Sequence, residues 1–267
     1  MAGWRLDDYK TWEELLFRAS FERSPNDLLM IRKFGRSASL TANTTEDVWE
    51  SGGTKALPYT AGELISVVSA SANDDLNGTG AWYVQIGGLD TSYNLQNETV
   101  TLDGLTPVQT TNQFIAINRV RSVFHGSGQK NAGAITITGA TSSNVYATIP
   151  AGECITQQSH FTIPAGYTLF TSNVAMTAYR ASGGSGTKSA EIDQMVYVPD
   201  VNAIYQTLRY GVTSNGGPYV SNNGLLSQTP GKSTLWFQAT PETNGTVVTT
   251  TAGYVLVKGD FNYITEI

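Results

Sequence analysis

Cysteine is nearly absent from this sequence, which excludes a disulfide-stabilised fold. Cys154 is the single cysteine among 267 residues, so no disulfide can form within the chain. The fold must therefore be held by noncovalent packing, and a chain of this length can bury a core large enough for that. Such cysteine usage is typical of a protein made in a reducing compartment. A lone cysteine is more often a small strand residue than a nucleophile.

Charge and long apolar runs are also scarce. Charged residues make up only 14% of the chain, and the net charge is −6 without a basic cluster. This pattern argues against direct binding of nucleic acid. No apolar segment approaches the ~20 residues that a membrane-spanning helix needs. Asp7 and Asp8 lie where a signal peptide would be apolar, so we expect neither a membrane anchor nor export.

Signals of catalysis are few. The two histidines, His125 and His160, belong to no nucleophile elbow, HExxH motif, P-loop or dinucleotide fingerprint, and a structural role is favoured for both. Several carboxylates fall in or near expected strands, and a glycosidase would need two of them to face each other across a cleft. A solvated strand face is the favoured interpretation for these residues, which are Glu98, Asp103, Glu191 and Asp193. We therefore expect no enzyme activity and no cofactor.

One loop has a partial calcium-binding pattern. Residues 73–78, NDDLNG, place oxygen-bearing side chains at alternate positions before a glycine. The bidentate glutamate expected at the twelfth position would fall on Val84, so the pattern is incomplete. A connection between strands is favoured, because Asn and Asp tolerate turn geometry. No metal site is assigned.

Two adjacent aromatic pairs could form a platform on which sugars stack. They are Trp82 with Tyr83 and Trp236 with Phe237. Neighbouring residues on a strand point to opposite faces. At least one member of each pair is therefore expected to lie in the core.

Short strands separated by turns dominate the rest of the chain. Runs of alternating or β-branched residues, bounded by Gly, Asn or Asp, follow one another from Ser37 onward. The tetrapeptide IPAG occurs twice, at Ile149–Gly152 and Ile163–Gly166, and each copy is typical of a turn at a strand end. We interpret the repeat as the boundary between two tandem antiparallel β-sandwich domains, the second resembling a jelly roll. The expected ranges are 1–36 for a helical N-terminal arm, 37–150 for the first sandwich and 151–267 for the second.

The N-terminal arm contains the clearest helical pattern. Apolar residues recur at helical spacing, and Ser24-Pro25-Asn26-Asp27 then ends the helix and could cap a second short helix at Leu28–Ile31. A short helix is marginal alone, so its apolar face needs a cover, either the protein's own β-domain or a partner. The candidate partner-binding residues are Trp12, Leu15, Leu16 and Phe21.

Several segments, taken in order, resemble a family of proteins. They are GRS at 35–37, TTEDVWESGG at 44–53, SVVSASANDDLNGTGAWYVQIGGLD at 66–90, NETVTLDG at 97–104, NAGAITITG at 131–139 and the paired IPAG. Their order is similar to that of a virion structural protein family of marine tailed phages. The resemblance covers about residues 35–180, and its individual segments are short turn and strand patterns of low specificity. It implies a non-enzymatic particle component built of β-sandwiches.

This resemblance leads to an expected role with two alternatives. The expected role is a capsid decoration or cement protein, or another head-associated component, that is made in the host cytoplasm and binds the shell of the virion. The expected partners are the major capsid protein and further copies of the chain, with a homotrimer as the expected oligomer. The first alternative is a tail or fibre component that binds a host surface glycan. The second is a carbohydrate-active enzyme or its binding module.

Overall fold

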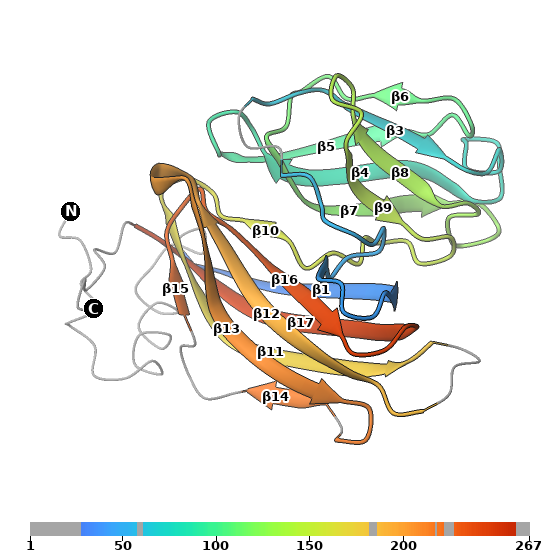
Figure 1. The fold of residues 1–267 in the computed structure, drawn as a ribbon. Helices are drawn as coiled ribbons and strands as arrows, with labels where there is room; N and C mark the ends of the chain where they lie inside the picture. The colour runs from blue at the N-terminus through green and yellow to red at the C-terminus, as the bar shows by residue number, and fades with distance from the viewer. Residues whose placement is uncertain (1–27, 58–60, 182–185, 217, 222–226, 260–267) are drawn as a thin grey trace.

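The chain forms a mainly β structure in which the strand pairings are antiparallel, as the sequence predicted. The computed structural model describes residues 28–57, 61–181, 186–216, 218–221 and 227–259 (Figure 1). Within them the helical structure is a single turn of 3₁₀-helix, η2 (Pro199–Val201). The expected helix that carries Trp12 and its neighbours lies outside the described residues.

The first described strand, β1 (Leu28–Leu40), corrects one expectation of the sequence analysis. A second short helix was expected at Leu28–Ile31, but these residues pair with the last strand, from Leu28 opposite Val257 onward. Burial alternates along this part of β1, with Met30 and Arg32 exposed and Lys33 buried. Pairing over eleven residue positions outweighs the local capping signal before Leu28.

Two five-stranded sheets form what we call the large unit. Their inner faces share one hydrophobic core, which includes Leu169, Val174, Ile192, Phe237 and Tyr254. The first sheet consists of β1, β17 (Thr246–Lys258), β11 (Tyr167–Arg180), β14 (Tyr219–Ser221) and β15 (Ser227–Thr229). The second consists of β10 (Phe161–Thr162), β16 (Thr234–Pro241), β12 (Ser189–Val198), β13 (Ala203–Thr213) and β2 (Glu46–Asp47).

Residues 61–149 form a small unit with its own core. Its two sheets enclose a second hydrophobic cluster that includes Ile65, Val84, Ile86, Val120 and Ile137. One sheet consists of β6 (Val108–Gln109), β3 (Ile65–Ser69), β8 (Ile135–Gly139) and β9 (Val145–Ile149). The other consists of β5 (Leu95–Thr101), β4 (Ala81–Leu89) and β7 (Ala116–His125).

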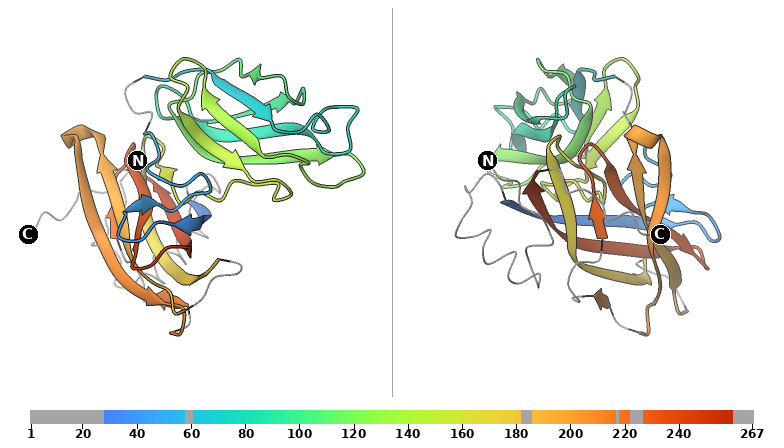
Figure 2. Two further views of the ribbon diagram at one scale, coloured as in Figure 1. Left: turned by 45° about the vertical axis from the view of Figure 1, so that its right-hand side comes forward. Right: turned by 90° about the vertical axis from the view of Figure 1, so that its left-hand side faces the viewer.

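The two units do not follow each other along the chain as the expected ranges 37–150 and 151–267 imply. Because β1 pairs with β17 and β2 pairs with β16, residues before the small unit belong to the sheets of the large unit. The expected boundary at residues 36 and 37 falls inside β1. The small unit is thus inserted between β2 and β10 of the large unit, and Figure 2 shows the two units side by side.

Both IPAG copies are turns at strand ends, as predicted. The first begins at the end of β9, the second ends just before β11, and their glycines Gly152 and Gly166 have φ values of 78° and 73°. An L-residue with a side chain rarely adopts such a φ, which explains the glycine. The segment between the copies is mostly irregular, and residues 156–163 are all buried.

Candidate functional site

The carboxylates that were screened for catalysis close loops or face solvent. Glu98 accepts hydrogen bonds from the backbone N–H groups of Thr111 and Asn112 at 2.6 and 3.0 Å. Asp193 binds Arg209 with 2.8 Å between Oδ1 and Nε, and Glu191 lies 3.3 Å from the same nitrogen. These residues therefore do not form a pair of carboxylates across a cleft. Asp103 lies in short bridges beside Asp75 and Thr106.

The loop with the partial calcium pattern is organised by one buried carboxylate. Asp74 is 0% exposed and accepts hydrogen bonds from the backbone of Ala81, Ala132 and Gly133 at 2.7 to 2.9 Å, and from the hydroxyl of Ser69 at 2.5 Å. Its oxygens are thus used to join the loop to β3, β4 and the segment before β8. No cluster of three metal-ligating side chains occurs among the described residues.

The residues considered for catalysis or sugar stacking differ in how far they are buried. The Nε2 of His125 lies 2.9 Å from the hydroxyl of Ser122 at the end of β7. Trp236 and Phe237 are both buried in β16, at 3% and 1% exposure, so neither can form a sugar platform. On β4, Tyr83 is half-buried and packs edge-on against Phe124, with 5.9 Å between ring centroids.

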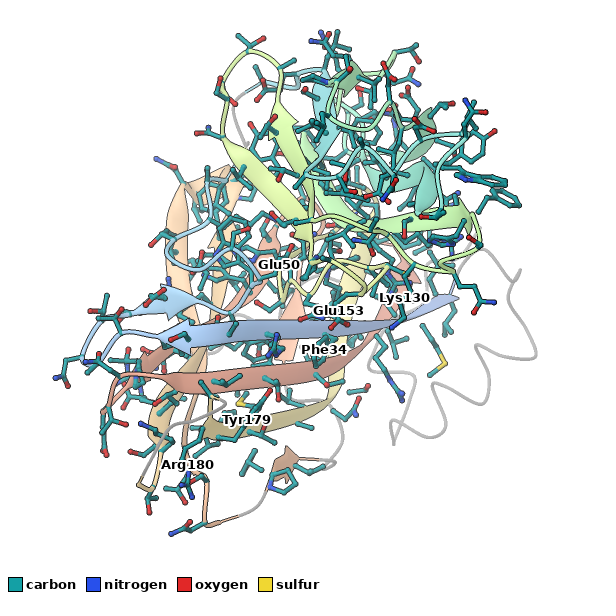
Figure 3. All side chains as sticks on the ribbon, turned by 90° about the vertical axis from the view of Figure 1, so that its right-hand side faces the viewer. Phe34, Glu50, Lys130, Glu153, Tyr179 and Arg180 are labelled. Atoms are coloured by element: carbon teal, nitrogen blue, oxygen red, sulfur yellow. The ribbon has the colours of Figure 1, made fainter. Side chains whose placement is uncertain are left out.

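A network of buried polar groups lies where the two units meet, and we call this region the junction. The side-chain amide of Asn118, from β7, pairs with both the N–H and the C=O of Thr162, from β10, at 2.8 Å each. The carboxylate of Glu50 accepts the N–H of Thr148 at 2.7 Å, and Figure 3 shows Glu50 between the units. The ammonium of Lys33 donates to the carbonyl of Asn118. Each contact joins one unit to the other.

Buried charges continue this network into the large unit. Asp47 accepts hydrogen bonds from the backbone N–H of Lys55 at 2.8 Å and from the side chain of Gln238 at 3.1 Å. The ammonium of Lys55 donates to Gln158 at 2.7 Å. His160 stacks on Trp236 with 5.8 Å between centroids, and its Nε2 is 3.3 Å from Oδ2 of Asp47.

Burial sets the protonation states at the junction. Desolvation, with the nearby charge of Lys55, lowers the pKa of His160 to about 4, so the ring is neutral at pH 7. Desolvation also lowers the pKa of Lys55 to about 8, although the carboxylates of Glu50 and Asp47 partly offset it. Burial raises the pKa of Glu50. For Asp47, burial is outweighed by the contact with His160 and the other hydrogen bonds, and its pKa is lowered.

These groups fix the units relative to each other and are poorly placed for chemistry on a substrate. His160 is 2% exposed and Lys55 6% exposed, so neither can be reached from solvent without opening the junction. The sequence analysis noted TTEDVWESGG only as part of a resemblance and did not anticipate that it supplies Asp47 and Glu50 to the junction. The one available signal was a pair of acidic residues beside the apolar Val48 and Trp49.

The buried ammonium of Lys55 predicts an unusual dependence of stability on pH. Between its folded pKa of about 8 and its unfolded value of 10.5, the unfolded chain binds more protons, so stability rises with pH. We expect the titration of Lys55 to contribute about 2 kcal/mol to the increase in the free energy of unfolding between pH 7.5 and 9.5, measured by urea denaturation. Above pH 10 the rise should reverse, because burial raises the pKa of Tyr254.

A matched variant isolates this effect. Lys55→Met keeps an unbranched side chain and removes the titrating group. In this variant the increase between pH 7.5 and 9.5 should shrink to the part contributed by Lys33, whose pKa is also lowered by burial and by Lys55 and Arg119. Equal slopes in both proteins would show that Lys55 titrates normally in the folded chain.

Exposed apolar side chains occur on the strands β13 and β14 and on the turn before β13. The edge strands β1 and β10 lie at the junction, whereas β13 and β14 form the opposite edges of the two sheets (Figure 1). We call these two strand edges, together with the turn before β13, the free edge. It carries Val201, Ile204, Tyr205, Tyr219 and Val220, which are 60, 55, 51, 37 and 50% exposed.

Comparisons with known proteins give no family. No protein-family model and no curated protein matches the chain. Among solved structures, the subviral particle of infectious bursal disease virus VP2 is similar over 87% of this chain and 73% of its own, with 10% identity and a TM-score of 0.21. A structure of the Gt strain of infectious bursal disease virus covers 92% of this chain and 88% of its own, with 9% identity and a TM-score of 0.12. Among the described residues, no helix has the length and apolar character needed to cross a membrane.

Proposed function

We propose that this protein is a non-enzymatic structural component of a virus particle, built of two β-sandwich units, and that it binds other particle proteins through its free edge. The finer assignment within this proposal is a capsid decoration or cement protein of a tailed phage, bound to the major capsid protein and to copies of itself. The observation that supports it best is the free edge, where exposed apolar side chains and an unpaired strand edge occur together.

The strand β13 has the properties of an assembly surface. It is eleven residues long and is the last strand of its sheet, so one side of its backbone has no neighbouring strand among the described residues. Soluble proteins usually protect such an edge with charge, proline or a covering segment. Here Ile204 and Tyr205 stand exposed on β13 itself, and Val201 precedes it. Pairing with a second protein would cover both the apolar side chains and the backbone groups.

The junction supports the same role. A particle protein that bridges subunits transmits force through its own structure, and two loosely linked units would deform. Here the two units are joined by direct hydrogen bonds that include Lys33 to Asn118 and Glu50 to Thr148. The carboxylates considered for catalysis are engaged in closing loops or in an ion pair, which favours a structural role over a glycosidase.

A double substitution at the free edge tests the proposal. Ile204→Asp with Tyr205→Asp places charge where apolar surface should be covered, and we expect loss of the homotrimer and at least about a tenfold weaker binding to purified particles. Analytical ultracentrifugation and particle co-sedimentation measure these effects. The melting temperature should change little, because both side chains are exposed.

Leu105→Asp is the matched control, since Leu105 is 62% exposed on the small unit, away from the free edge. Equal assembly by the double variant and the control would refute the role of the free edge.

A shortened chain that begins at Leu28 tests the N-terminal arm separately and keeps β1 complete. Weaker particle binding at an unchanged melting temperature would support docking through Trp12, Leu15, Leu16 and Phe21.

A further inference from the structure

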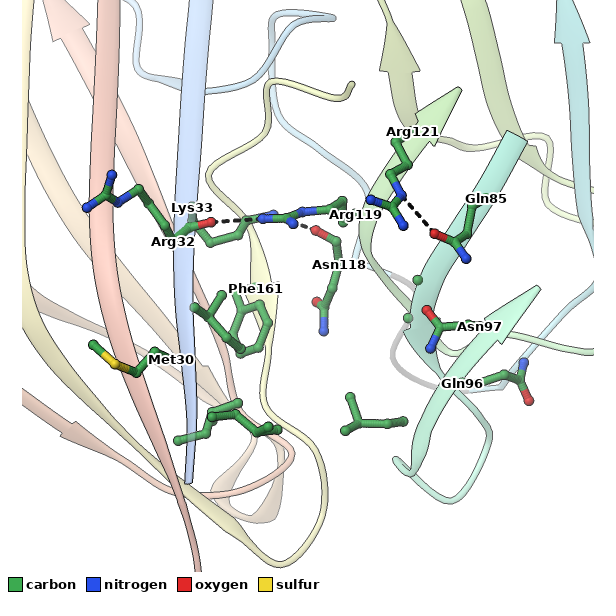
Figure 4. A pocket seen from close by; sticks show the side chains of 16 residues that line it. Met30, Arg32, Lys33, Gln85, Gln96, Asn97, Asn118, Arg119, Arg121 and Phe161 are labelled. Atoms are coloured by element: carbon green, nitrogen blue, oxygen red, sulfur yellow. Dashed lines mark hydrogen bonds between the residues drawn. The ribbon is translucent and has the colours of Figure 1, made fainter. Parts of the chain in front are cut away.

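A groove with a volume of 520 Å³ lies between the two units, beside the junction (Figure 4). Its apolar lining comes from Leu95 of the small unit and from four residues of the large unit, which are Leu29, Ile31, Phe161 and Leu256. On the opposite wall, β4, β5 and β7 of the small unit present polar side chains. Figure 4 shows that Met30 and Arg32 point to the other side of β1, so their backbones line the groove and their side chains do not.

Two arginines line this groove, and no carboxylate lines it with them. Lys33, Arg119 and Arg121 line the groove, and no Asp or Glu is among its lining residues. This is unexpected in a chain whose net charge is −6. Arg119 donates to the backbone carbonyl of Arg32 at 3.0 Å, and Arg121 donates through Nε to Gln85 at 2.7 Å. Neither arginine has an ion pair with a described carboxylate, so both retain the capacity to bind an anion.

The polar wall is a regular face of the small unit's three-stranded sheet. In its register Gln85 lies between Arg121 and Thr99, and Gly87 lies between Arg119 and Asn97. A Cβ at Gly87 would meet Oδ1 of Asn97 at 3.0 Å, so glycine leaves a hollow between the arginine and the amide. The side of this sheet that faces the groove therefore carries two rows of hydrogen-bonding side chains. Arg121 and Gln85 belong to one row, and Arg119 and Asn97 belong to the other.

An aromatic pair lies next along the same strands. Tyr83 precedes Gln85 by two residues and so points to the same face of β4. Its ring packs edge-on against Phe124, which is 69% exposed and has a φ of 54°. A bulky residue rarely adopts a positive φ, and such strain is concentrated at functional sites. An exposed aromatic ring beside planar polar groups offers an apolar face for a ligand that is also rich in hydrogen-bonding groups.

We propose that the groove and the adjoining Tyr83–Phe124 pair bind an acidic oligosaccharide of the uronate type. The arginines would hold the carboxylates, the amides would bind hydroxyl groups, and the aromatic rings would contact the apolar face of a sugar. An acidic peptide fits less well, because pairing with the edge strand β1 would compete with the hydrogen bond that the carbonyl of Arg32 already accepts from Arg119. This inference is independent of the proposed assembly role.

Calorimetric titration of the full chain tests the proposal, with hexagalacturonate as the probe and maltohexaose and hexaglutamate as comparisons. We expect hexagalacturonate to bind, and to bind more weakly as salt is raised, while the two comparison ligands bind at least about tenfold more weakly. Arg121→Gln should weaken binding of hexagalacturonate about tenfold or more, because a charge-assisted hydrogen bond is lost. Phe124→Ala should weaken it severalfold, and Gly87→Val should block it by filling the hollow.

The control variant is Arg209→Gln, which removes an exposed arginine of β13 on the large unit, away from the groove. It should bind hexagalacturonate like the unchanged protein, and every variant should keep its melting temperature. Equal binding of maltohexaose would overturn the role of charge, and equal binding of hexaglutamate would show an acidic-peptide site instead. Absence of hexagalacturonate binding, or the same loss in Arg209→Gln, would overturn the proposal.

Discussion

Replacing Asp74 by alanine is expected to destabilise the small unit by roughly 3–5 kcal/mol, among the largest effects of any single substitution. The buried carboxylate accepts hydrogen bonds from the backbone of Ala81, Ala132 and Gly133 and from the hydroxyl of Ser69. Alanine would leave these donors buried without an acceptor, and each such donor costs about 1–3 kcal/mol. Urea denaturation followed by tryptophan fluorescence measures the loss.

The neighbouring acidic residue provides the control. Asp75→Ala removes a carboxylate that accepts only the local N–H of Asn77 at 2.6 Å, so it should cost about 1 kcal/mol or less. Calcium should leave the melting temperature of the unchanged protein as it is, because the oxygens of Asp74 are already used. A calcium-dependent rise in melting temperature, or equal costs for the two alanine variants, would contradict this description of the loop.

Replacing Asp47 by alanine is expected to lower the stability of the large unit by about 3 kcal/mol or more. Asp47 is 2% exposed and accepts hydrogen bonds from Lys55 and Gln238. Its charge also raises the pKa of Lys55, so removing it leaves a buried ammonium with less compensation. The pKa of Lys55 should therefore fall further, and the rise of stability with pH should begin below pH 8.

Two variants separate the hydrogen bonds from the charge. Asp47→Asn keeps one acceptor oxygen and should cost less than alanine. Glu46→Ala removes the adjacent, half-buried carboxylate, which accepts the N–H groups of Thr41 and Gly53 at 3.1 and 2.8 Å, and should cost about 1–2 kcal/mol. A loss at Asp47 no greater than at Glu46 would mean that the junction contributes little to stability.

Local pattern was sufficient to predict most strands of this protein. Alternation and turn residues predicted successive strands from Ser37 onward, because these signals act over a few neighbouring residues, and the structure has strands such as Ile65–Ser69, Ala81–Leu89 and Ile135–Gly139 there. The glycines of the IPAG copies were read as turns for the same reason. The pattern failed at Leu28–Ile31, where capping residues suggested a helix and pairing with β17 produced a strand.

The junction and the groove could not be predicted, since they depend on contacts between distant parts of the chain. Asp47 and Gln238 are separated by 191 residues, and Lys33 and Asn118 by 85. Nothing near Lys33 in the sequence indicates that its ammonium is buried. The sequence likewise did not predict that Phe124 is exposed, because its positive φ departs from the strand pattern around it.

Composition and short-range sterics are enough to make this chain mainly β, to exclude a disulfide within it and to turn it at both IPAG copies, so these properties follow from the residues alone. The insertion of the small unit depends instead on tertiary structure, since the pairing of β1 with β17 brings together the two ends of the described chain. Tertiary structure also decides which charges are buried and which line the groove. Desolvation depends on what packs around a group, and a linear sequence does not contain that information.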